Sequence, residues 1–395
     1  MRLLGRLRAM PGPSRLIGSE IYRRSSYGGR HPLAIPRVSL MLDLVRTLGW
    51  VPEGAYIEAT PATPAELARF HDPGYIAAVQ CAERERRVDP DVSERHHIGR
   101  NGNPVYPEVF SRPAIACGAT LAAVELLLSG SQAPAIIHSP AGGTHHGRRD
   151  RAVGFCYFND VVLGILRLLD RGVARVLYVD LDAHHGDGVE DAFRDEPRAL
   201  TISIHERGRW PHTGTVEDQG PSWRNLPVPL DFNDSELAFL LDEVVLPLAQ
   251  RFAPEAVVIQ SGADALAHDP MTRLGLSNRA LWRAVDRLRG LAPRTLVLGG
   301  GGYNPWGVAR CWAGIWATLS GIEIPERLPE GAERLLRGVT WRHSLARNPP
   351  ERWFTTLADL PRDGPVRPEI PVVAAAALRT LQAPVQFQAL ERHQA

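Results

Sequence analysis

Five ionisable side chains follow directly on an apolar run in the stretch RVLYVDLDAHHGDGVEDAF, which spans residues 175–193. The run 176–179 has the β-branched, apolar composition of a buried strand. The side chains that follow it within eight positions are Asp180, Asp182, His184, His185 and Asp187. Ionisable groups are costly to bury unless they are paired or bind a metal ion. The stretch therefore predicts a strand whose end supplies metal ligands and the acids that support them.

The types and spacing of these residues indicate the kind of metal. Asp182 and His184 are two positions apart, so they can share one side of an extended segment. Asp264 follows another apolar run and can arrive from a neighbouring strand. Two carboxylates and one imidazole make a three-ligand site with a place left for water, which is the open arrangement of hydrolytic zinc. Iron(II) accepts the same ligands, so the ligand set alone leaves both ions as alternatives.

Four other apolar runs also end in side chains that can do chemistry. After the runs 135–137, 199–204, 256–259 and 295–298 come, in turn, His145 and His146, His205 and Trp210, Asp264, and Tyr303. In open α/β sheets the ligand site lies beyond the carboxyl ends of the strands. A single His or Asp of this kind is more often a hydrogen-bonded structural group, but that explanation does not account for the whole set. We therefore expect one site built from five strand ends.

The elements that must position these residues follow from the hydrophobic pattern. Amphipathic stretches near 116–129, 158–171, 236–251, 278–290 and 305–320 alternate with the apolar runs. This alternation predicts a single large α/β domain, in which helices cover both faces of a central parallel sheet. Long loops with Gly and Pro are expected at 86–113, 140–155, 205–234 and 262–277, and loops of that length are often functional.

The two ends of the chain differ in composition from the middle. The first 35 residues hold seven Arg and a single acid, Glu20, and they lack the apolar core of a secretory signal. We interpret residues 1–16 as an N-terminal extension rather than a leader, and 17–325 as the catalytic domain. From 326 onward Pro and Arg become more frequent, and the apolar runs expected of strands no longer occur. Residues 326–395 are expected to form an appendage that packs on the main domain.

Composition restricts the possible partners and compartments. The 395 residues carry a net charge of +1 and are 44% hydrophobic, so no overall field favours nucleic acid or a membrane surface. No run of 18 apolar residues is present, so no membrane span is predicted. The four cysteines form no CxxC pair, which argues against cysteine-ligated zinc and for a reducing compartment. We expect a cytoplasmic protein with no direct nucleic-acid binding, and its oligomeric state stays open.

At this point the chain resembles the histone deacetylase family, including its bacterial acetoin-utilization and acetylpolyamine-amidohydrolase relatives. The segments that carry the resemblance are HPLAIPR with Arg37, AGGTHH, GFCYFNDVVLGI, YVDLDAHHGDG, GADALAHDP and GGGGYN. They cover roughly residues 17–325, in the family's order. HPLAIPR and GNPVYPEVF favour the acetoin-utilization branch. The resemblance implies an arginase/deacetylase-like fold.

The resemblance also implies roles for individual residues. Zinc would be bound by Asp182, His184 and Asp264. His146 would act as general base and acid with Asp187 as its partner, His145 would pair with Asp180, and Tyr303 would donate to the carbonyl oxygen. A structural potassium or sodium ion would be held around Asp180, Asp182, His184, Ser203 and Ile204. The tunnel for the acyl-lysine chain would be lined by Gly154, Phe155, Trp210 and Met271. His185 and His205 would have structural roles.

One loop departs from the family's pattern. Protein deacetylases of this family carry an Asp at the tunnel rim that accepts hydrogen bonds from the peptide backbone. In HIGRNGNPVYPE the alignment places Gly102 at that position, with Asn103 beside it. Glycine offers no acceptor and an Asn amide is neutral, so we expect weaker binding of peptide backbone and better use of small acylamides. Gly102→Asp is then expected to improve hydrolysis of acetyl-peptides.

The substrate and two rival functions stay open at this stage. The same chemistry cleaves acetyl-lysine in proteins, acetylated polyamines and other acylamides, and motifs do not separate these. An arginase-like dinuclear manganese hydrolase would need further bridging carboxylates, and the loop after 259 offers only Asp264 and Asp269. A non-catalytic acyl-lysine binder would be expected to lack a catalytic group, whereas His145, His146 and Tyr303 are all present.

Overall fold

One parallel sheet organises the part of the chain that the structure describes. The structure is a computed structural model, and it describes residues 14–24, 27–29, 31–130 and 135–379. Within these residues, eight strands pair in the order β2-β1-β3-β8-β7-β4-β5-β6, and every pair is parallel. The strands are β1 (Arg15–Gly18), β2 (Tyr56–Glu58), β3 (Ile136–Ser139), β4 (Val176–Asp180), β5 (Ala199–Glu206), β6 (Trp223–Val228), β7 (Ala256–Gln260) and β8 (Arg294–Leu298).

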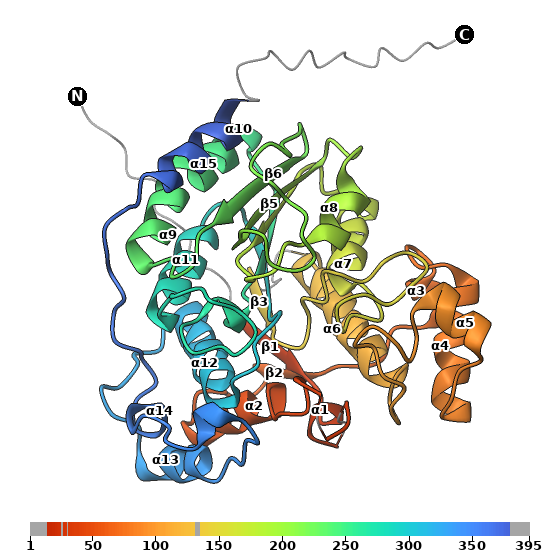
Figure 1. Cartoon of the computed structure of the whole chain (residues 1–395), viewed down its shortest axis with the longest axis horizontal. Coiled ribbons are helices and arrows are strands. Elements are labelled where there is room, and N and C mark those ends of the chain that lie inside the picture. Colours follow the sequence, from red (N-terminus) through yellow and green to blue (C-terminus); the bar gives the residue numbers. More distant parts are fainter. Residues whose placement is uncertain (1–13, 25–26, 30, 131–134, 380–395) are drawn as a thin grey trace.

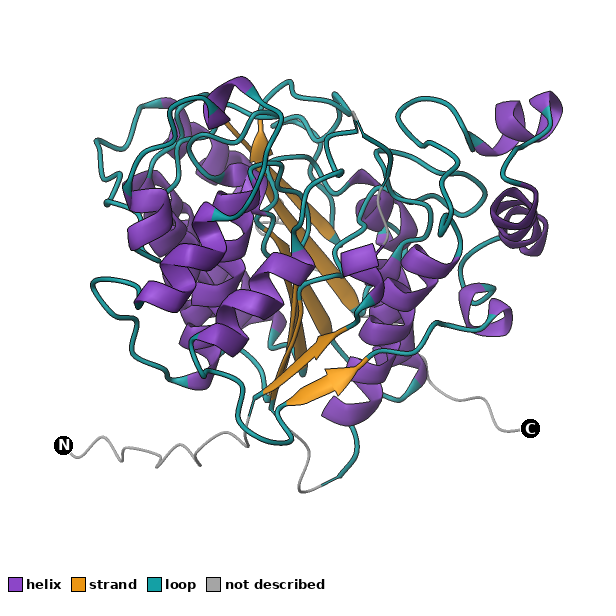
Figure 2. Ribbon diagram, turned by 90° about the horizontal axis from the view of Figure 1, so that it is seen from below, coloured by secondary structure: helices purple, strands orange, loops and turns teal. Residues whose placement is uncertain are grey.

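Helices cover both faces of this sheet, as predicted (Figures 1 and 2). One face carries α6 (Ser111–Leu127), α7 (Asp160–Asp170) and α8 (Asp187–Phe193). The other carries α2 (Val38–Thr47), α9 (Asp234–Leu240), the π-helical turn η1 (Leu241–Val245), α10 (Leu246–Phe252), α11 (Asn278–Leu288) and α12 (Pro305–Ser320). The chain is therefore an α/β protein with the layered architecture expected from its sequence pattern.

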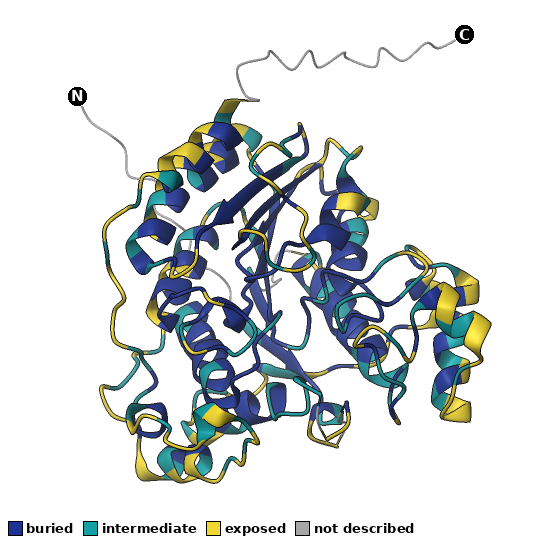
Figure 3. Ribbon diagram, viewed as in Figure 1, coloured by how far each residue is buried: buried dark blue, intermediate teal, exposed yellow. Residues whose placement is uncertain are grey.

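The central strands are buried on both sides, because their side chains alternate between two cores. Val176 and Tyr178 of β4 belong to the core beneath α6 and α7, and Leu177 and Val179 belong to the core beneath α11 and α12. The central strands are dark blue, the colour of buried residues, in Figure 3. This burial explains why β4 reads as a continuous apolar run rather than an alternating one.

Shorter elements lie within segments that the sequence pattern assigns to loops. β6 lies inside the expected loop 205–234, and α5 (Pro90–His96) lies inside the expected loop 86–113. Together with α3 (Pro64–Leu67) and α4 (Pro73–Glu85), α5 forms an excursion beside α6, away from the sheet (Figure 1). The short helix α1 (Ile21–Arg24) follows β1. β1 itself begins at Arg15, two residues before the expected start of the catalytic domain.

The segment after residue 325 lies against the sheet domain. It contains α13 (Glu330–Arg337), the 3₁₀ turn η3 (Ser344–Ala346), α14 (Arg352–Thr355) and α15 (Glu369–Arg379). Trp353, Leu357 and Ile370 belong to the main hydrophobic core, and α15 packs against β6, η1 and α9. Residues 1–13 of the expected extension and 380–395 of the expected appendage lie outside the described residues. No helix among the described residues is long and apolar enough to cross a membrane.

Candidate metal centre and its surroundings

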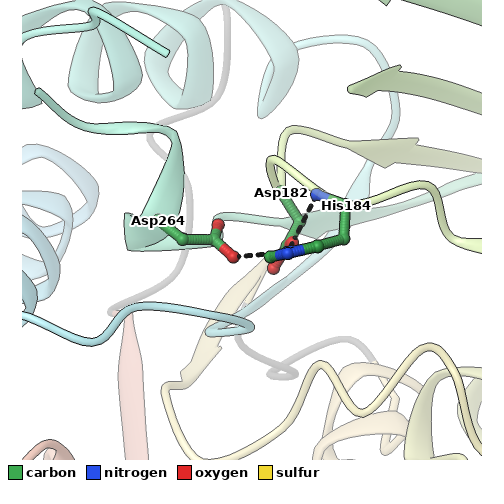
Figure 4. Close-up of side chains that lie close together, drawn as sticks. All are labelled: Asp182, His184 and Asp264. Atoms are coloured by element: carbon green, nitrogen blue, oxygen red, sulfur yellow. Dashed lines mark hydrogen bonds and ion pairs between the residues drawn. The ribbon is translucent and has the colours of Figure 1, made fainter. Parts of the chain in front are cut away.

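Asp182, His184 and Asp264 meet at the carboxyl ends of two neighbouring strands (Figure 4). Asp182 and His184 lie on the loop after β4, and Asp264 lies on the 3₁₀ turn η2 (Ala263–Ala265) after β7. His184 Nδ1 is 2.9 Å from Asp264 Oδ2 and 3.3 Å from Asp182 Oδ1. One ligand atom from each of the three residues lies within 4.8 Å of the others, and all three residues are buried.

Backbone hydrogen bonds aim the two carboxylates inward. Asp182 Oδ1 accepts from the His184 N–H at 3.0 Å, and Asp182 Oδ2 accepts from the Gly301 N–H at 2.6 Å. Asp264 Oδ1 accepts from the Ala183 N–H at 3.0 Å. The turn after β4 and the glycine turn after β8 therefore orient the donor atoms, as outer hydrogen bonds do around metal ligands.

The charge of this cluster calls for a cation. Burial alone would lower the pKa of His184, but the carboxylates of Asp182 and Asp264 raise it to about 10. Burial and the nearby Asp182 raise the pKa of Asp264. Two buried carboxylates thus share one imidazole, and buried charges are stable only when they are paired or coordinate a metal. Two carboxylate oxygens and one imidazole nitrogen fit a divalent metal ion with an open position.

Two histidine–aspartate pairs lie beside the three ligands. His145 Nδ1 is 2.7 Å from Asp180 Oδ2, and His146 Nδ1 is 2.7 Å from Asp187 Oδ1. The two imidazole centroids are 4.0 Å apart. An ionised carboxylate only accepts hydrogen bonds, so each Nδ1 carries the proton and each Nε2 is left for other partners.

The two imidazoles titrate in opposite directions. Burial would lower the pKa of His145, but Asp180 and Asp182 raise it to about 9. Burial and the positive charge of His145 lower the pKa of His146 to about 4. Protonation of both adjacent rings is costly, so their titration is coupled. His145 takes up a proton more readily than His146.

Arg148 is a supporting residue that the sequence analysis did not identify. Its guanidinium donates to Asp187 and to Asp191. Although burial would raise the pKa of Asp187, His146 and Arg148 lower it to about 2. No short sequence motif indicates this contact, because Arg148 and Asp187 lie 39 positions apart.

Tyr303 lies on the glycine turn between β8 and α12, and two residues hold that turn in place. Arg37 donates to the carbonyl oxygen of Gly300 at 2.6 Å and to that of Gly302 at 3.3 Å. Asp269 Oδ2 accepts from the Tyr303 N–H at 2.7 Å. Burial, together with the Asp264 carboxylate, raises the pKa of Tyr303 well above its usual value. The phenol therefore stays protonated and can donate.

The four residues expected in the tunnel line one cavity. This cavity, of about 640 Å³, is lined by Gly154, Phe155, Trp210 and Met271, together with His146, His184 and Tyr303. Gly154 has φ +54°, and a Cβ at that position would lie 2.4 Å from the Trp210 ring. Only glycine therefore fits there, and the close approach narrows the cavity at this point.

The rim of the cavity corrects one expectation. Asn103 is 1% exposed, its Oδ1 accepts from the Phe155 N–H at 2.9 Å, and its Nδ2 donates to the Ala152 carbonyl at 3.2 Å. The Asn103 amide is therefore not available to a substrate. Gly102 has φ +80°, and an added Cβ would lie 2.7 Å from the Phe155 ring. Gly102→Asp would displace a tunnel residue, so it is no longer expected to improve peptide hydrolysis.

The remaining predicted residues lie near the centre but outside the cavity. His185 contacts Glu190 at 2.9 Å and Thr213 at 2.8 Å, and His205 contacts the Gly214 carbonyl at 2.9 Å. These contacts within the fold agree with structural roles for both rings. The residues expected around a monovalent ion, Asp180, Asp182, His184, Ser203 and Ile204, lie on β4, the loop after it and β5. Asp180 and Ser203 are partners in the register of these two strands.

The chain is an α/β protein in which three buried residues could hold a metal ion and two histidine–aspartate pairs lie beside them. The family model for the histone deacetylase domain matches residues 31–319. The chain belongs to the histone deacetylase family, as its motifs predict.

Individual relatives cover most of the chain. It is 33% identical over 368 residues to the acetoin utilization protein AcuC of Bacillus subtilis, covering 90% of this chain and 92% of that protein. It is 35% identical over 301 residues to histone deacetylase 8 of Xenopus tropicalis, covering 74% of this chain and 80% of that protein. The crystal structure of an HDAC homolog from Aquifex aeolicus is similar with a TM-score of 0.88 and 36% identity, covering 92% of this chain and 99% of that one.

Proposed function

We propose that this chain is a zinc-dependent amidohydrolase that removes acetyl, or another acyl group, from the ε-amine of lysine or a related amine. Membership of the histone deacetylase family supports deacetylase activity. The observation that carries the proposal is the meeting of three metal ligands, two histidine–aspartate pairs and Tyr303 at one cavity. A non-catalytic acyl-lysine binder would not need this complete set.

Asp182, His184 and Asp264 would hold one zinc ion per chain. When bound there, zinc lowers the pKa of a water molecule and polarises a carbonyl group. His146 accepts the proton of the attacking water at Nε2, because Asp187 occupies Nδ1. The same nitrogen returns the proton to the leaving amine. The charge of Asp187, held by Arg148, keeps the imidazole in this tautomer.

His145 and Tyr303 complete the reaction centre. His145, paired with Asp180, holds positive charge beside His146 and so keeps the second ring neutral and able to accept a proton. Tyr303 donates a hydrogen bond to the carbonyl oxygen as negative charge develops there. A potassium or sodium ion near Asp180 and Ser203 is part of the proposal and would stabilise the turn that carries the ligands.

The cavity wall supports acyl-lysine over acetylpolyamines. Its lining includes Arg148, Arg151 and Arg209, and none of the described residues that line it is an Asp or a Glu. A polyamine carries further positive charges and would meet no carboxylate in this lining. An acyl-lysine side chain is neutral and aliphatic, and Phe155 and Trp210 provide apolar contact for it.

The compartment is part of the same proposal. The four cysteines are free thiols, as expected for a protein of the reducing cytoplasm. Nucleic acid is not proposed as a partner, because the net charge of +1 provides no attraction for phosphate.

Metal removal tests the proposed function. We expect a chelator to abolish release of acetate from an acetyl-lysine peptide, zinc to restore it, and Asp264→Ala to prevent the restoration. Metal analysis should find one ion per chain, whereas an arginase-like centre would hold two. Full activity in the metal-stripped protein, or in Asp264→Ala, would contradict the proposal. An N-acetylpolyamine measured in parallel should be the poorer substrate by kcat/KM.

A further inference from the structure

A cavity of about 270 Å³ lies where the segment after residue 325 meets the sheet domain. Its wall comes from the loop 266–268 after η2, from the start of α12, and from residues 352–353 and 359–362. We call it the arginine cavity, because Arg310, Arg352 and Arg362 line it. None of the described residues of its wall also lines the cavity beside the metal centre. It is therefore a separate place at which a ligand could bind.

The wall of the arginine cavity holds three guanidinium groups and one carboxylate. That carboxylate, Asp359, is the one acid among the described residues of the wall. Its Oδ1 accepts from Arg310 at 2.7 Å, and its Oδ2 accepts from the Asn278 N–H at 3.2 Å. Asp359 thus balances Arg310, and no further acid of the described wall balances Arg352 and Arg362. The cavity carries an excess of positive charge.

Two of the three arginines are held in place by backbone carbonyl groups. Arg310 is 1% exposed, and its Nε donates to the Thr356 carbonyl oxygen at 2.8 Å. The Nε of Arg362 donates to the Gly275 carbonyl oxygen. Because these side chains are already ordered, an anion that binds them costs little side-chain entropy.

The third arginine has a buried donor without an acceptor. The Nε of Arg352 has no hydrogen-bond partner among the described residues. Buried polar atoms are nearly always hydrogen-bonded in native proteins, and an unpaired one indicates a ligand or a water. Since Arg352 lines the arginine cavity, an acceptor bound there could satisfy this donor.

Two further features of the wall agree with an anionic ligand. Asn304 and Gly307, at the beginning of the 16-residue helix α12, line the cavity, and the N-terminal end of a helix attracts negative charge. Burial, followed by the positive charges of Arg362 and Arg352, lowers the pKa of His268 in the same wall. Both guanidinium groups therefore act on one place in the cavity.

We propose that the arginine cavity binds a phosphate group, either as free phosphate or as a phosphate monoester. Guanidinium groups match the geometry and the charge of phosphate oxygens, and a dianion would balance Arg352 and Arg362 together. One water needs about 10–15 Å³ of such volume, so a cavity of about 270 Å³ has room for a phosphate group and for an organic group attached to it. The bound phosphate would join the segment after residue 325 to the start of α12. This site goes beyond the proposed function and takes no part in amide hydrolysis.

Calorimetric titration of the full-length, zinc-loaded protein with inorganic phosphate and with phenyl phosphate tests the inference. We expect at least one of them to bind with a Kd of about 1 mM or below. Tighter binding of phenyl phosphate would identify a monoester as the ligand, and equal binding would identify free phosphate. Either result supports a phosphate site if the binding depends on Arg352.

Arg352→Gln is the variant that places the binding, and Arg347→Gln is its matched control. Arg347 lies on the same segment, is exposed, and does not line the arginine cavity. Arg352→Gln should weaken the binding of phosphate at least about tenfold, because a charged hydrogen bond is lost. Arg347→Gln should leave the affinity unchanged. Phosphate should also raise the Tm of the wild type and of Arg347→Gln more than that of Arg352→Gln, since a ligand stabilises the state that binds it.

Arg352→Lys keeps the positive charge but lacks the planar fork of the guanidinium, so its affinity should lie between those of the wild type and Arg352→Gln. If Arg352→Gln does not fold, wild-type affinity in Arg352→Lys would overturn the inference. Absence of binding by both phosphates would overturn it as well. Equal binding by the wild type and a folded Arg352→Gln would place the phosphate elsewhere, for example at the zinc ion, and so contradict the site. None of these measurements depends on turnover, so their failure leaves the proposed function unaffected.

Discussion

Two neighbouring imidazoles take different roles because each meets a different set of charges. Both rings are buried and both are paired with a carboxylate, yet the pKa of His145 is raised to about 9 and that of His146 is lowered to about 4. His145 meets the carboxylates of Asp180 and Asp182, whereas His146 meets the positive charge of His145. Pairs of titratable groups with separated pKa values are typical of acid–base sites.

Tyr303→Phe should lower turnover much more than substrate binding. In the proposed mechanism the phenol donates to an oxygen that becomes negative in the transition state, and removal of such a donor typically costs about 10²–10³ in kcat. KM should change little, because the ground-state carbonyl oxygen carries less charge. Steady-state kinetics on an acetyl-lysine peptide would measure both. Wild-type turnover in Tyr303→Phe would require another donor for that oxygen.

The residues that the sequence could identify are those within short motifs. Asp182 and His184 lie in DLDAHHGD, and their types and spacing indicate metal ligation without any knowledge of the fold. Arg148 donates to Asp187, 39 positions away in sequence, so no local pattern identifies it. The expected gain from Gly102→Asp is wrong for a related reason, since the contact between an added Cβ and the Phe155 ring arises only in the folded chain.

At the scale of elements, the glycine turn between β8 and α12 leaves room for the metal ligands. A Cβ at Gly301 would lie 2.1 Å from Asp264 Oδ2, and the Gly301 N–H already donates to Asp182 Oδ2. We expect Gly301→Ala to weaken zinc binding by about 10- to 100-fold, as loss of outer support does at other metal sites. Competition with a chromophoric chelator would measure the affinity.

Gly307→Ala is the matched control for this turn. Gly307 lies in the first turn of α12, where the atom nearest to an added Cβ is 3.5 Å away. Alanine has the better helix propensity, so this variant should keep the zinc affinity of the wild type and its stability. Equal zinc affinities for Gly301→Ala and Gly307→Ala would contradict the steric argument.

His71 lies just before α4 and contacts the backbone of the segment between β3 and α7 at two places, and its protonation should weaken the fold. Its Nδ1 is 2.9 Å from the Arg148 carbonyl, and its Nε2 accepts from the Asn159 N–H at 2.9 Å. Burial lowers the pKa of His71 from 6.5 to about 4. Stability is therefore unaffected above pH 6.5 and is lost as the pH falls from 6.5 to 4, because the unfolded chain takes up the proton first. The loss is on the order of 3 kcal/mol.

His71→Gln should reduce this pH dependence. At pH 7, where the imidazole hydrogen bonds are intact, the variant should have a lower free energy of unfolding than the wild type. This difference in free energy of unfolding, the gap, should narrow as the pH falls to 4.5. Urea unfolding of both zinc-loaded proteins at several pH values would measure the gap, and release of the metal at low pH would affect both alike. A gap that stays constant with pH would show that His71 is not one of the groups that titrate on unfolding.

The elements themselves were predictable where burial makes the pattern simple. β4, β5, β7 and β8 are long apolar runs, because helices cover both of their faces. β1 and β2 have only four and three residues, too few for a periodic signal. β6 carries Arg224 and Asn225 near its start, and these polar residues make its sequence typical of a loop. Both side chains are nevertheless buried.

At the scale of the whole molecule, the segment after residue 325 closes the core on the side of α9, α11 and α12. The guanidinium of Arg367 donates two hydrogen bonds to the fully buried Glu236 of α9, at 2.6 and 2.7 Å. Trp353 and Ile370 occupy the main core. We therefore propose that the segment folds together with the catalytic domain, and that removal of residues 326–395 leaves no cooperatively folded protein.

A pair of substitutions on α15 tests this coupling without deletion of the segment. Ile370 is 0% exposed and packs in the main core, whereas Val372 on the same helix is 61% exposed. Ile370→Ala should lower the free energy of unfolding of the whole chain by about 2–5 kcal/mol, because it leaves a cavity in that core. Val372→Ala should change it by less than about 0.5 kcal/mol. If the segment unfolded on its own, Ile370→Ala would produce a separate early transition and leave the main one in place. A single urea transition followed by both tryptophan fluorescence and far-ultraviolet circular dichroism, shifted in Ile370→Ala alone, is the outcome that coupling requires.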